Sequence, residues 1–421
     1  MRKEELKLIV IYVLTMIFIG LPYYSIYGQD TSDNDTNSFR WNGFASISYI
    51  KVDPVDHAIP NQNGTIEAGL QANWKITDHL EVRGFLTYVP WFEDSEPLGF
   101  EYLLVDTFTQ VWDQDIGLRV GRIYLPYGFF GDTRANPASR QGIIPPMILI
   151  WPQNKALYDR GEGGNVYLYG INSWFRYAVE TGRLVHSNPQ PAINYVTGTA
   201  GGVTSKYVDT TFQHLELDGD FWRIRLDHMN PTQGFEITDE HYQIAHKKMP
   251  SSYYSTGIHE DQYDLQYIGL QYYQDWFDLT AQQIRWEYLE TGSLQNYYDA
   301  LNSFYGKFKI PEIPYPSYWY KMWVYTIGLN FDRVETDITY GTNDTTSKDR
   351  SGADSIDTHR IVSVKYAPEN SSWVYKMEYQ SIYGLRYLGA QEHPQFLTKS
   401  PNSTDLEKRW YLYGISAVYL F

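Results

Sequence analysis

The stretch GTIEAGLQANWKITDHLEVRGFLTY, residues 64–88, carries hydrophobic side chains at every second position on both sides of a short polar break. Ile66, Leu70 and Trp74 share one phase before the break, and Val82 and Leu86 share one phase after it. Most residues between them are polar, and successive side chains of a strand point to opposite faces. The stretch therefore predicts two strands with one face in an apolar medium and the other in a polar medium.

The same alternation recurs along most of the chain. In residues 320–331, for example, Trp323 and Tyr325 alternate with Thr326 and Gly328. The segments within 100–112 and 164–180 fit least well; in the first of them Asp106 and Gln110 interrupt the apolar face. The segments predicted as strands are 39–52, 64–74, 80–89, 100–112, 117–124, 164–170, 173–180, 211–218, 221–230, 264–273, 276–288, 320–331, 333–340, 359–366, 373–383 and 410–421.

The connections between these segments are alternately short and long. Turns such as 75–79 and 274–275 are short, whereas connections such as 125–163 and 231–263 are long. Short turns at one end and long loops at the other, joining an even number of strands, are typical of a transmembrane β-barrel. We therefore predict an all-β fold, a transmembrane antiparallel β-barrel of sixteen strands with an aqueous lumen. A soluble β-sandwich is the alternative, but it would not normally place every long connection at one end.

The composition excludes several other classes of protein. The chain has 421 residues, 34 basic and 50 acidic side chains, a formal net charge of -16 and no cysteine. A mean hydropathy of -0.45 excludes a bundle of membrane helices, and the acidity argues against nucleic acid as a partner. Aromatic residues reach 17%, which suits a structure with a large membrane interface.

The first segment has the order of a secretory signal peptide. Basic residues are followed by an uncharged apolar run at 8–20 and by a cleavage region that ends at Gly28. We predict a signal peptide at 1–28, a polar N-terminal tail at 29–38 and the barrel at 39–421. An uncleaved anchor is the alternative for the first segment.

Two motifs resemble a known family. Residues 118–130, LRVGRIYLPYGFF, place Gly121, Pro126 and Gly128 in a pattern that resembles the phosphate-selective porin superfamily of Gram-negative outer membranes. The chain ends with Tyr419 and Phe421 on one face, which resembles the C-terminal signature that the outer-membrane assembly machinery reads. The resemblance is specific over about residues 118–170.

The resemblance implies a homotrimer of sixteen-stranded barrels in which the third long loop folds inward and narrows the pore. The third long connection here is 125–163, directly after the motif. The residues expected at this constriction are Arg134, Arg140, Asp159 and Arg160.

The polar phase of the strands faces the lumen in this prediction, and it holds acidic and basic residues in similar number. The net charge is therefore expected mainly in the external loops. Rings of charged side chains set the ionic preference of a pore. The residues predicted to line the pore are Glu67, Glu81, Arg83, Arg119, Arg223, Arg225, Asp227, Arg333, Glu335, Asp337, Lys376 and Glu378.

Four arginines are the best candidates for a strip that attracts anions: Arg119, Arg122, Arg223 and Arg225. The alternative is that they pair with facing carboxylates and order the wall. Arg122 falls in the outward phase, so that a β-bulge or a position at the rim has to account for it.

Enzyme motifs are missing from the sequence. It has no G-x-S-x-G elbow and no H-E-x-x-H motif. His241, His246 and His259 fall in one predicted external loop at spacings that match no metal motif. We predict no catalytic activity, no metal site and no cofactor.

The sequence thus predicts a porin in the outer membrane of a Gram-negative bacterium, for passive diffusion of small hydrophilic solutes or ions. Its expected partners are the lipid bilayer with lipopolysaccharide, the diffusing solutes, the assembly machinery and further copies of itself in a homotrimer. One alternative is a non-conducting barrel that displays its external loops as an adhesin or assembly partner. Another is a gated channel for a specific solute such as phosphate.

Overall fold

The computed structural model describes residues 38–53, 62–88, 98–125, 127–129, 136–140, 142–143, 160–187, 203–237, 257–290, 319–346, 356–383 and 409–421. One compact unit comprises Thr36–Leu420; apart from Phe421, the other unit, Met1–Asp35, lies outside the described residues. The signal peptide predicted at 1–28 and nearly all of the tail predicted at 29–38 therefore lie outside them too.

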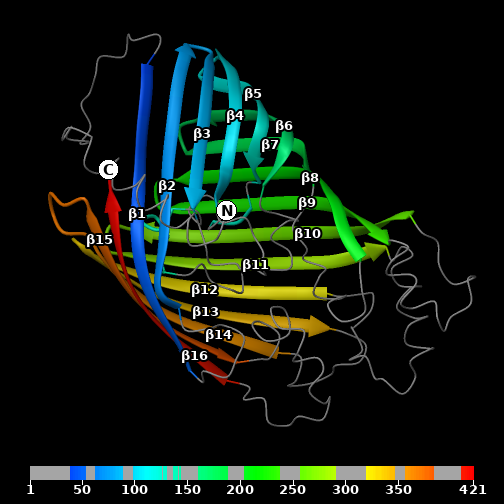
Figure 1. The fold of residues 1–421 in the computed structure, drawn as a ribbon. Coiled ribbons are helices and arrows are strands. Elements are labelled where there is room, and N and C mark those ends of the chain that lie inside the picture. Colours follow the sequence, from blue (N-terminus) through cyan, green and yellow to red (C-terminus); the bar gives the residue numbers. More distant parts are fainter. Residues whose placement is uncertain are drawn as a thin grey trace, which may run out of the picture. The chain divides into compact units, whose positions relative to one another are not determined.

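Every described strand belongs to one sheet (Figure 1). The strands are β1 (Ser38–Asp53), β2 (Gln62–Thr77), β3 (Leu80–Tyr88), β4 (Leu98–Val111), β5 (Gln114–Tyr124), β6 (Arg160–Ile171), β7 (Phe175–Ser187), β8 (Val203–Gly219), β9 (Trp222–Ile237), β10 (Gly257–Gln274), β11 (Phe277–Glu290), β12 (Trp319–Phe331), β13 (Val334–Thr346), β14 (Ile356–Tyr366), β15 (Trp373–Tyr383) and β16 (Arg409–Leu420).

The sheet closes on itself. Each strand pairs antiparallel with its neighbours in sequence, and β1 pairs with β16 from Phe44 opposite Leu420 to Asp53 opposite Tyr411. Closure leaves no strand edge in the described sheet, so the backbone N–H and C=O groups of every strand find partners on both sides. The prediction of a closed antiparallel barrel of sixteen strands is confirmed.

Tight turns join the strands in pairs at one end of the barrel. The turn between β4 and β5 consists of Trp112 and Asp113, which both have positive φ, at 50° and 62°. This is the backbone of a type I′ turn, whose twist matches that of the flanking strands. Aromatic side chains protrude at several turns: Trp112 is 90% exposed and Trp174 is 81% exposed.

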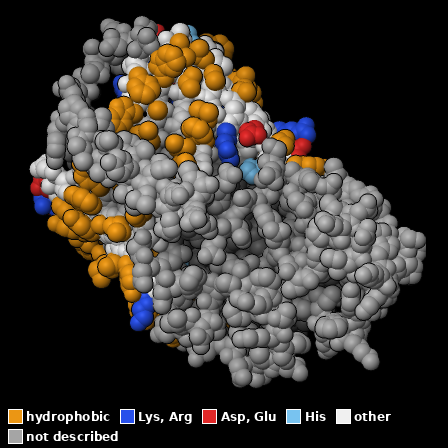
Figure 2. All heavy atoms as spheres, in the orientation of Figure 1, with side chains coloured by type: hydrophobic (Ala, Val, Ile, Leu, Met, Phe, Trp, Pro, Cys, Tyr) orange, Lys and Arg blue, Asp and Glu red, His pale blue; other side chains and the backbone are white. Residues whose placement is uncertain are grey.

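The outward face of the barrel is apolar near these turns. On β10, for example, Ile268, Leu270 and Tyr272 are exposed, whereas Leu265 and Tyr267 on the other phase are buried. Figure 2 shows hydrophobic side chains over much of the described surface in that view, with few charged side chains among them. A closed sheet with an apolar outer face and charged residues buried on its inner face is the reverse of a soluble protein.

The outward face becomes polar toward the long connections on β7 to β11. On β10 the outward position after Ile268 is Gln266, followed by Asp264, which lies 2.6 Å from His228 Nε2 on β9. The apolar band is thus bounded, and strand pairing continues beyond it. None of the described segments forms a helix long and apolar enough to cross a membrane.

Candidate functional site

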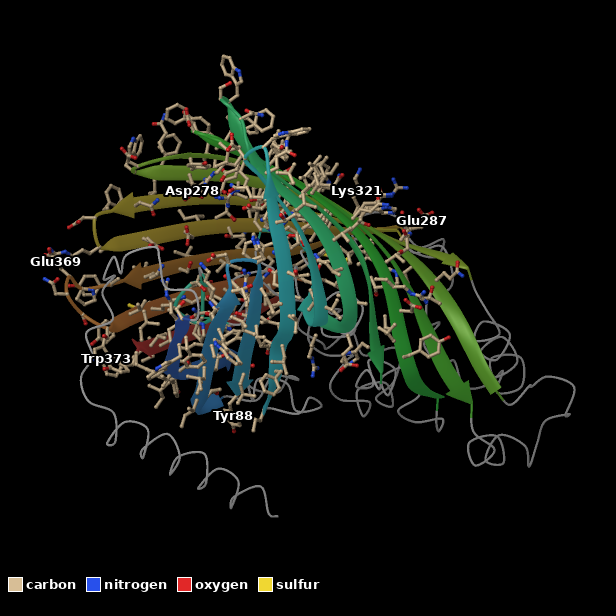
Figure 3. The ribbon with its side chains drawn as sticks, turned by 90° about the horizontal axis from the view of Figure 1, so that it is seen from above. Tyr88, Asp278, Glu287, Lys321, Glu369 and Trp373 are labelled. Carbon is tan, nitrogen blue, oxygen red and sulfur yellow. The ribbon has the colours of Figure 1, made fainter. Side chains whose placement is uncertain are left out.

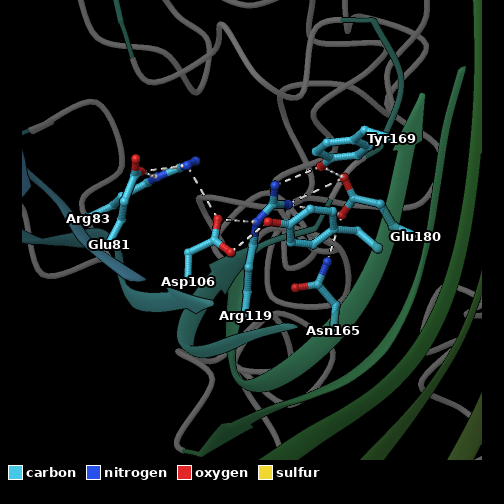
Figure 4. Close-up of polar contacts among 8 residues, drawn as sticks. Glu81, Arg83, Asp106, Arg119, Asn165, Tyr169 and Glu180 are labelled. Atoms are coloured by element: carbon cyan, nitrogen blue, oxygen red, sulfur yellow. Dashed lines mark hydrogen bonds and ion pairs between the residues drawn. The ribbon is translucent and has the colours of Figure 1, made fainter. Parts of the chain in front are cut away.

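A network of ion pairs and hydrogen bonds on the inner wall joins β4 to β7 (Figure 4). Arg119 on β5 is at its centre: Nε lies 3.2 Å from Asp106 Oδ2, and Nη1 lies 3.3 Å from Glu180 Oε2. Nη2 of Arg119 donates to the hydroxyl of Tyr169 at 2.7 Å, and Asn165 donates to Glu180 at 2.7 Å. The positive charge of Arg119 therefore faces two carboxylates.

The network continues through an aromatic ring and onto β3. The guanidinium carbon of Arg119 lies 4.2 Å from the ring centroid of Tyr167, a cation–π geometry. The Tyr167 hydroxyl donates to Asp106 Oδ1 at 2.8 Å. Arg83 Nη2 lies 2.8 Å from Glu81 and 3.4 Å from Asp106. Charge-assisted hydrogen bonds of this kind hold side chains in fixed positions along the wall.

A second network covers the inner face of β8 and β9. Arg223 lies 3.6 Å from Glu216 and 3.5 Å from Asp218. Arg225, which is 3% exposed, lies 3.5 Å from Glu216 and 3.4 Å from Asp227. The geometry therefore favours the alternative in which these arginines pair with facing carboxylates, over a strip of arginines that attracts anions.

Two inner-wall residues of β9 and β10 also contact the third long connection. The backbone N–H of Gly128 donates to Asp227 Oδ2 at 2.8 Å, and that of Phe129 donates to the hydroxyl of Tyr267 at 3.1 Å. The Phe129 and Tyr267 rings meet edge to face, with centroids 6.1 Å apart. The other oxygen of Asp227 lies 2.5 Å from His214 Nδ1.

A later part of the same connection contacts β2 and β15. Arg140 Nη2 lies 2.5 Å from Glu67 Oε2, and the side chains of both residues are almost fully buried. Lys376 Nζ donates to the backbone oxygens of Arg140 and Gly142. The connection thus supplies one cation and two carbonyl oxygens to charged residues of the wall.

Hydrophobic packing accompanies these polar contacts. Ala138 belongs to a buried cluster with Phe44 and Phe85. The backbone N–H of Ile143 donates to Glu378 Oε2 at 2.6 Å, while its side chain belongs to a second buried cluster. Side chains of the wall and of the connection therefore exclude water together on this side.

The backbone conformation explains why glycine occupies two positions of the 118–130 motif. Gly121 has φ 136°, and a Cβ added there would lie 2.4 Å from the backbone oxygen of Leu103. Gly128 has φ 66° and is the residue whose N–H reaches Asp227. Residues other than glycine rarely adopt such conformations. Arg122 directly follows Gly121, and the register of β5 with β4 and β6 is continuous through both residues, so the pairing shows no β-bulge at Arg122.

Three further residues of the predicted site lie in a turn, in an ion pair and at the start of a strand. Arg333 lies in the turn between β12 and β13, where it pairs with Glu369 of the next turn, and not on the inner wall. Glu335 pairs with Lys365 at 2.9 Å. Arg160, expected at the constriction, opens β6 opposite Tyr124.

Arg134 and Asp159 lie outside the described residues. Tyr419 lies one residue before the end of β16, with its ring centroid 5.0 Å from that of Trp373, and Phe421 follows the last strand. Their role as an assembly signal stays a prediction.

Several residues of these networks were not predicted from the sequence. Asp106 was interpreted as an interruption of an apolar face, but it is fully buried on the inner wall. Tyr167, His214, Asp218 and Tyr267 were also not predicted. Asp106 and Asp218 do lie in the inward phase of their strands, so the register of neighbouring strands would have revealed them.

The inner wall can bind polar solutes and ions, because it combines carboxylates, guanidinium groups and hydroxyls in fixed positions. Among the described residues, no group of three His, Cys, Asp or Glu side chains is placed to hold a metal ion. The protein thus has the architecture of a closed antiparallel barrel with a charged inner wall and an apolar outer face.

No family model and no curated protein matches the chain. Solved structures do resemble it. OmpT (in-vitro folded), an outer membrane protein of Vibrio cholerae, superposes with a TM-score of 0.53 and 10% identity, over 93% of this chain and 100% of that one. An anion-selective porin from Comamonas acidovorans gives 0.50 and 12%, over 91% and 100%. Salmonella typhi OmpF in complex with daunomycin gives 0.50 and 10%, over 92% and 99%. At these identities the likeness shows a shared fold.

Proposed function

We propose that this protein is a porin that forms a water-filled channel for passive diffusion of small hydrophilic solutes or ions. The observation that carries the proposal is the closed sixteen-stranded barrel with charged networks on its inner wall. Barrels of eight strands are filled by their own side chains, whereas sixteen strands leave room for an aqueous channel.

The outer face supports a location in a membrane, which we propose is the outer membrane of a Gram-negative bacterium. Outward residues near the tight turns are apolar, and tryptophans protrude at the turns themselves, among them Trp112 and Trp174. Transmembrane barrels have this arrangement, an apolar band with aromatic residues at the interface. The outward polar positions on β7 to β11 would then lie toward the headgroups, where lipopolysaccharide is the expected contact.

We also propose that the third long connection folds into the lumen. Its first part contacts inner-wall residues of β9 and β10, and its later part contacts inner-wall residues of β2 and β15. In a ring of sixteen strands, β10 and β2 lie eight strands apart, on opposite sides. The contacts at Gly128 and Phe129 and the contacts at Arg140 thus lie on opposite sides of the barrel, which supports a connection that passes through the lumen.

The homotrimer, the signal peptide at 1–28 and recognition of Tyr419 and Phe421 by the assembly machinery stay proposals that rest on the sequence. A preference for phosphate likewise rests on the sequence alone, because the inner wall gives it no support. The arginines of that wall contact carboxylates, and so does Arg140 of the third long connection. The arginines of the wall that do so are Arg83, Arg119, Arg176, Arg223 and Arg225.

Reconstitution in a planar bilayer tests the proposed function. Purified protein that is folded, as judged by heat-dependent migration on a gel, should give stepwise increases of current. A display barrel without a channel would give none. Silence from verified folded protein would overturn the porin proposal.

The inner-wall location of Arg223 can be tested by its effect on ion selectivity. In Arg223→Ala, Glu216 and Asp218 lose a cation that lies within 3.6 Å of both, so the wall becomes more acidic. The reversal potential in a KCl gradient should shift toward that of a cation-selective pore. A matched control is Arg183→Ala, which breaks an ion pair with Asp209 on the outward phase of β7 and β8 and should leave the reversal potential unchanged. Equal shifts in both variants would contradict the assignment of the faces.

A further inference from the structure

Two carboxylates of the inner wall face each other across a glycine near the tight turns. Gly328 on β12 pairs with Asp278 on β11 and with Asp337 on β13. A Cβ added to Gly328 would lie 2.0 Å from Asp278 Oδ2. The carboxyl group of Asp278 therefore occupies the space over Gly328, on the side that leads to Asp337. Figure 3 shows Asp278 toward the end of the barrel where Glu369 lies, away from Glu287 and Lys321.

Asp337 is buried without a direct partner. Its exposed fraction is 7%, and it makes no hydrogen bond and no ion pair with any residue in the part of the chain that the structure describes. Asp278 contacts Gln271 and Thr280, but its buried Oδ1 has no hydrogen-bond partner among the described residues. Both carboxylates thus have oxygen atoms that could accept a further hydrogen bond or bind a cation, and that no described residue occupies.

The lysine ammonium groups near Asp337 are bonded to other groups. The charged groups that act on Asp337 are Asp278, Glu335, Lys365 and Lys376. Lys365 Nζ lies 2.9 Å from Glu335 Oε2, and Lys376 Nζ donates to the backbone oxygens of Arg140 and Gly142. Neither ammonium group forms a bond with Asp337.

A buried carboxylate without a partner is costly, and a second carboxylate nearby adds repulsion. Such a pair is stabilised when a cation lies between its members. On the wall of a water-filled channel, small cations are available to do so.

We propose that Asp278 and Asp337 form a transit site for a small monovalent cation such as K⁺, at the turn end of the lumen. The proposal rests on the proposed function as a channel. Two carboxylates, with water completing the coordination, bind more weakly than a site of three or more protein ligands. Conduction needs this weakness, because an ion has to leave as well as enter.

The test is the permeability ratio of K⁺ to Cl⁻, measured from the reversal potential in a KCl gradient. Asp337→Asn, and separately Asp278→Asn, should lower the ratio by about twofold or more. The matched control is Asp332→Asn, which removes an exposed carboxylate from the turn that precedes β13 and should leave the ratio unchanged. Asparagine has almost the shape of aspartate, so these variants should fold.

A second measurement does not depend on conduction. If K⁺ binds, wild-type protein should unfold at a higher urea concentration in KCl than in choline chloride of the same ionic strength. Asp337→Asn should lose this difference. Conductance with unchanged ratios and no K⁺ dependence of unfolding would overturn the site and leave the channel intact. Absence of current from folded wild-type protein would overturn the channel, whereas K⁺ dependence alone would still support cation binding.

Discussion

Replacement of Leu270 by arginine should strongly destabilise the barrel in a bilayer. Leu270 is on the outward phase of β10, 51% exposed, between Ile268 and Tyr272, which are also exposed. An arginine on the lipid face of a transmembrane barrel costs about 2–4 kcal/mol near the middle of the bilayer. The free energy of unfolding, measured with urea in lipid vesicles, should fall by that amount.

The control for this experiment lies on the same face of the same strand. Gln266→Arg changes the outward position four residues toward the long connections, next to Asp264, with which Gln266 Nε2 already bonds at 2.8 Å. Near an interface the cost of arginine falls to about 0–1 kcal/mol. Equal costs at Leu270 and Gln266 would mean that the apolar band does not mark the depth of the membrane.

Leu270 lies within the apolar band and Gln266 lies beyond it. This boundary also explains how much of each strand could be predicted from the sequence. All sixteen strands were predicted, because the apolar outward phase produces a period of two. The predicted segment 264–273 nevertheless begins later in the chain than β10, which starts at Gly257. Before residue 264 the sequence GIHEDQY (257–263) no longer alternates between apolar and polar residues, yet the backbone of β10 still pairs with β9 there.

Inner-wall partners were harder to predict, because they depend on the register between strands. Asp106 and Arg119 come together because β4 and β5 pair with these residues directly opposite. Arg140 and Glu67 are 73 residues apart, and Arg140 lies in a long connection, not in a strand that pairs with β2. Alternation shows which phase faces inward, but it does not show which charges become neighbours.

Arg140→Ala should have the largest effect among the contacts of the third connection. The side chains of Arg140 and Glu67 are 5% and 2% exposed. Removal of one partner from a buried ion pair typically costs about 3–5 kcal/mol, because the other charge stays buried without compensation. The matched control, Arg183→Ala, breaks an ion pair whose arginine is 68% exposed, and it should lower the free energy of unfolding far less, because water screens exposed ion pairs. Urea unfolding of both variants checks the difference.

The double variant Glu67→Gln with Arg140→Met distinguishes two effects of Arg140→Ala. One is the cost of leaving Glu67 without its partner, and the other is displacement of the third long connection from the wall. The double variant removes both charges of the pair, so neither is left buried without its partner and most of the stability should return. Lys376 and Glu378 still hold the backbone at Arg140, Gly142 and Ile143. If the connection narrows the pore, Arg140→Ala should raise the single-channel conductance, whereas the double variant should stay close to wild type. A loss of stability without any change in conductance would mean that this part of the connection packs against the wall away from the narrowest point.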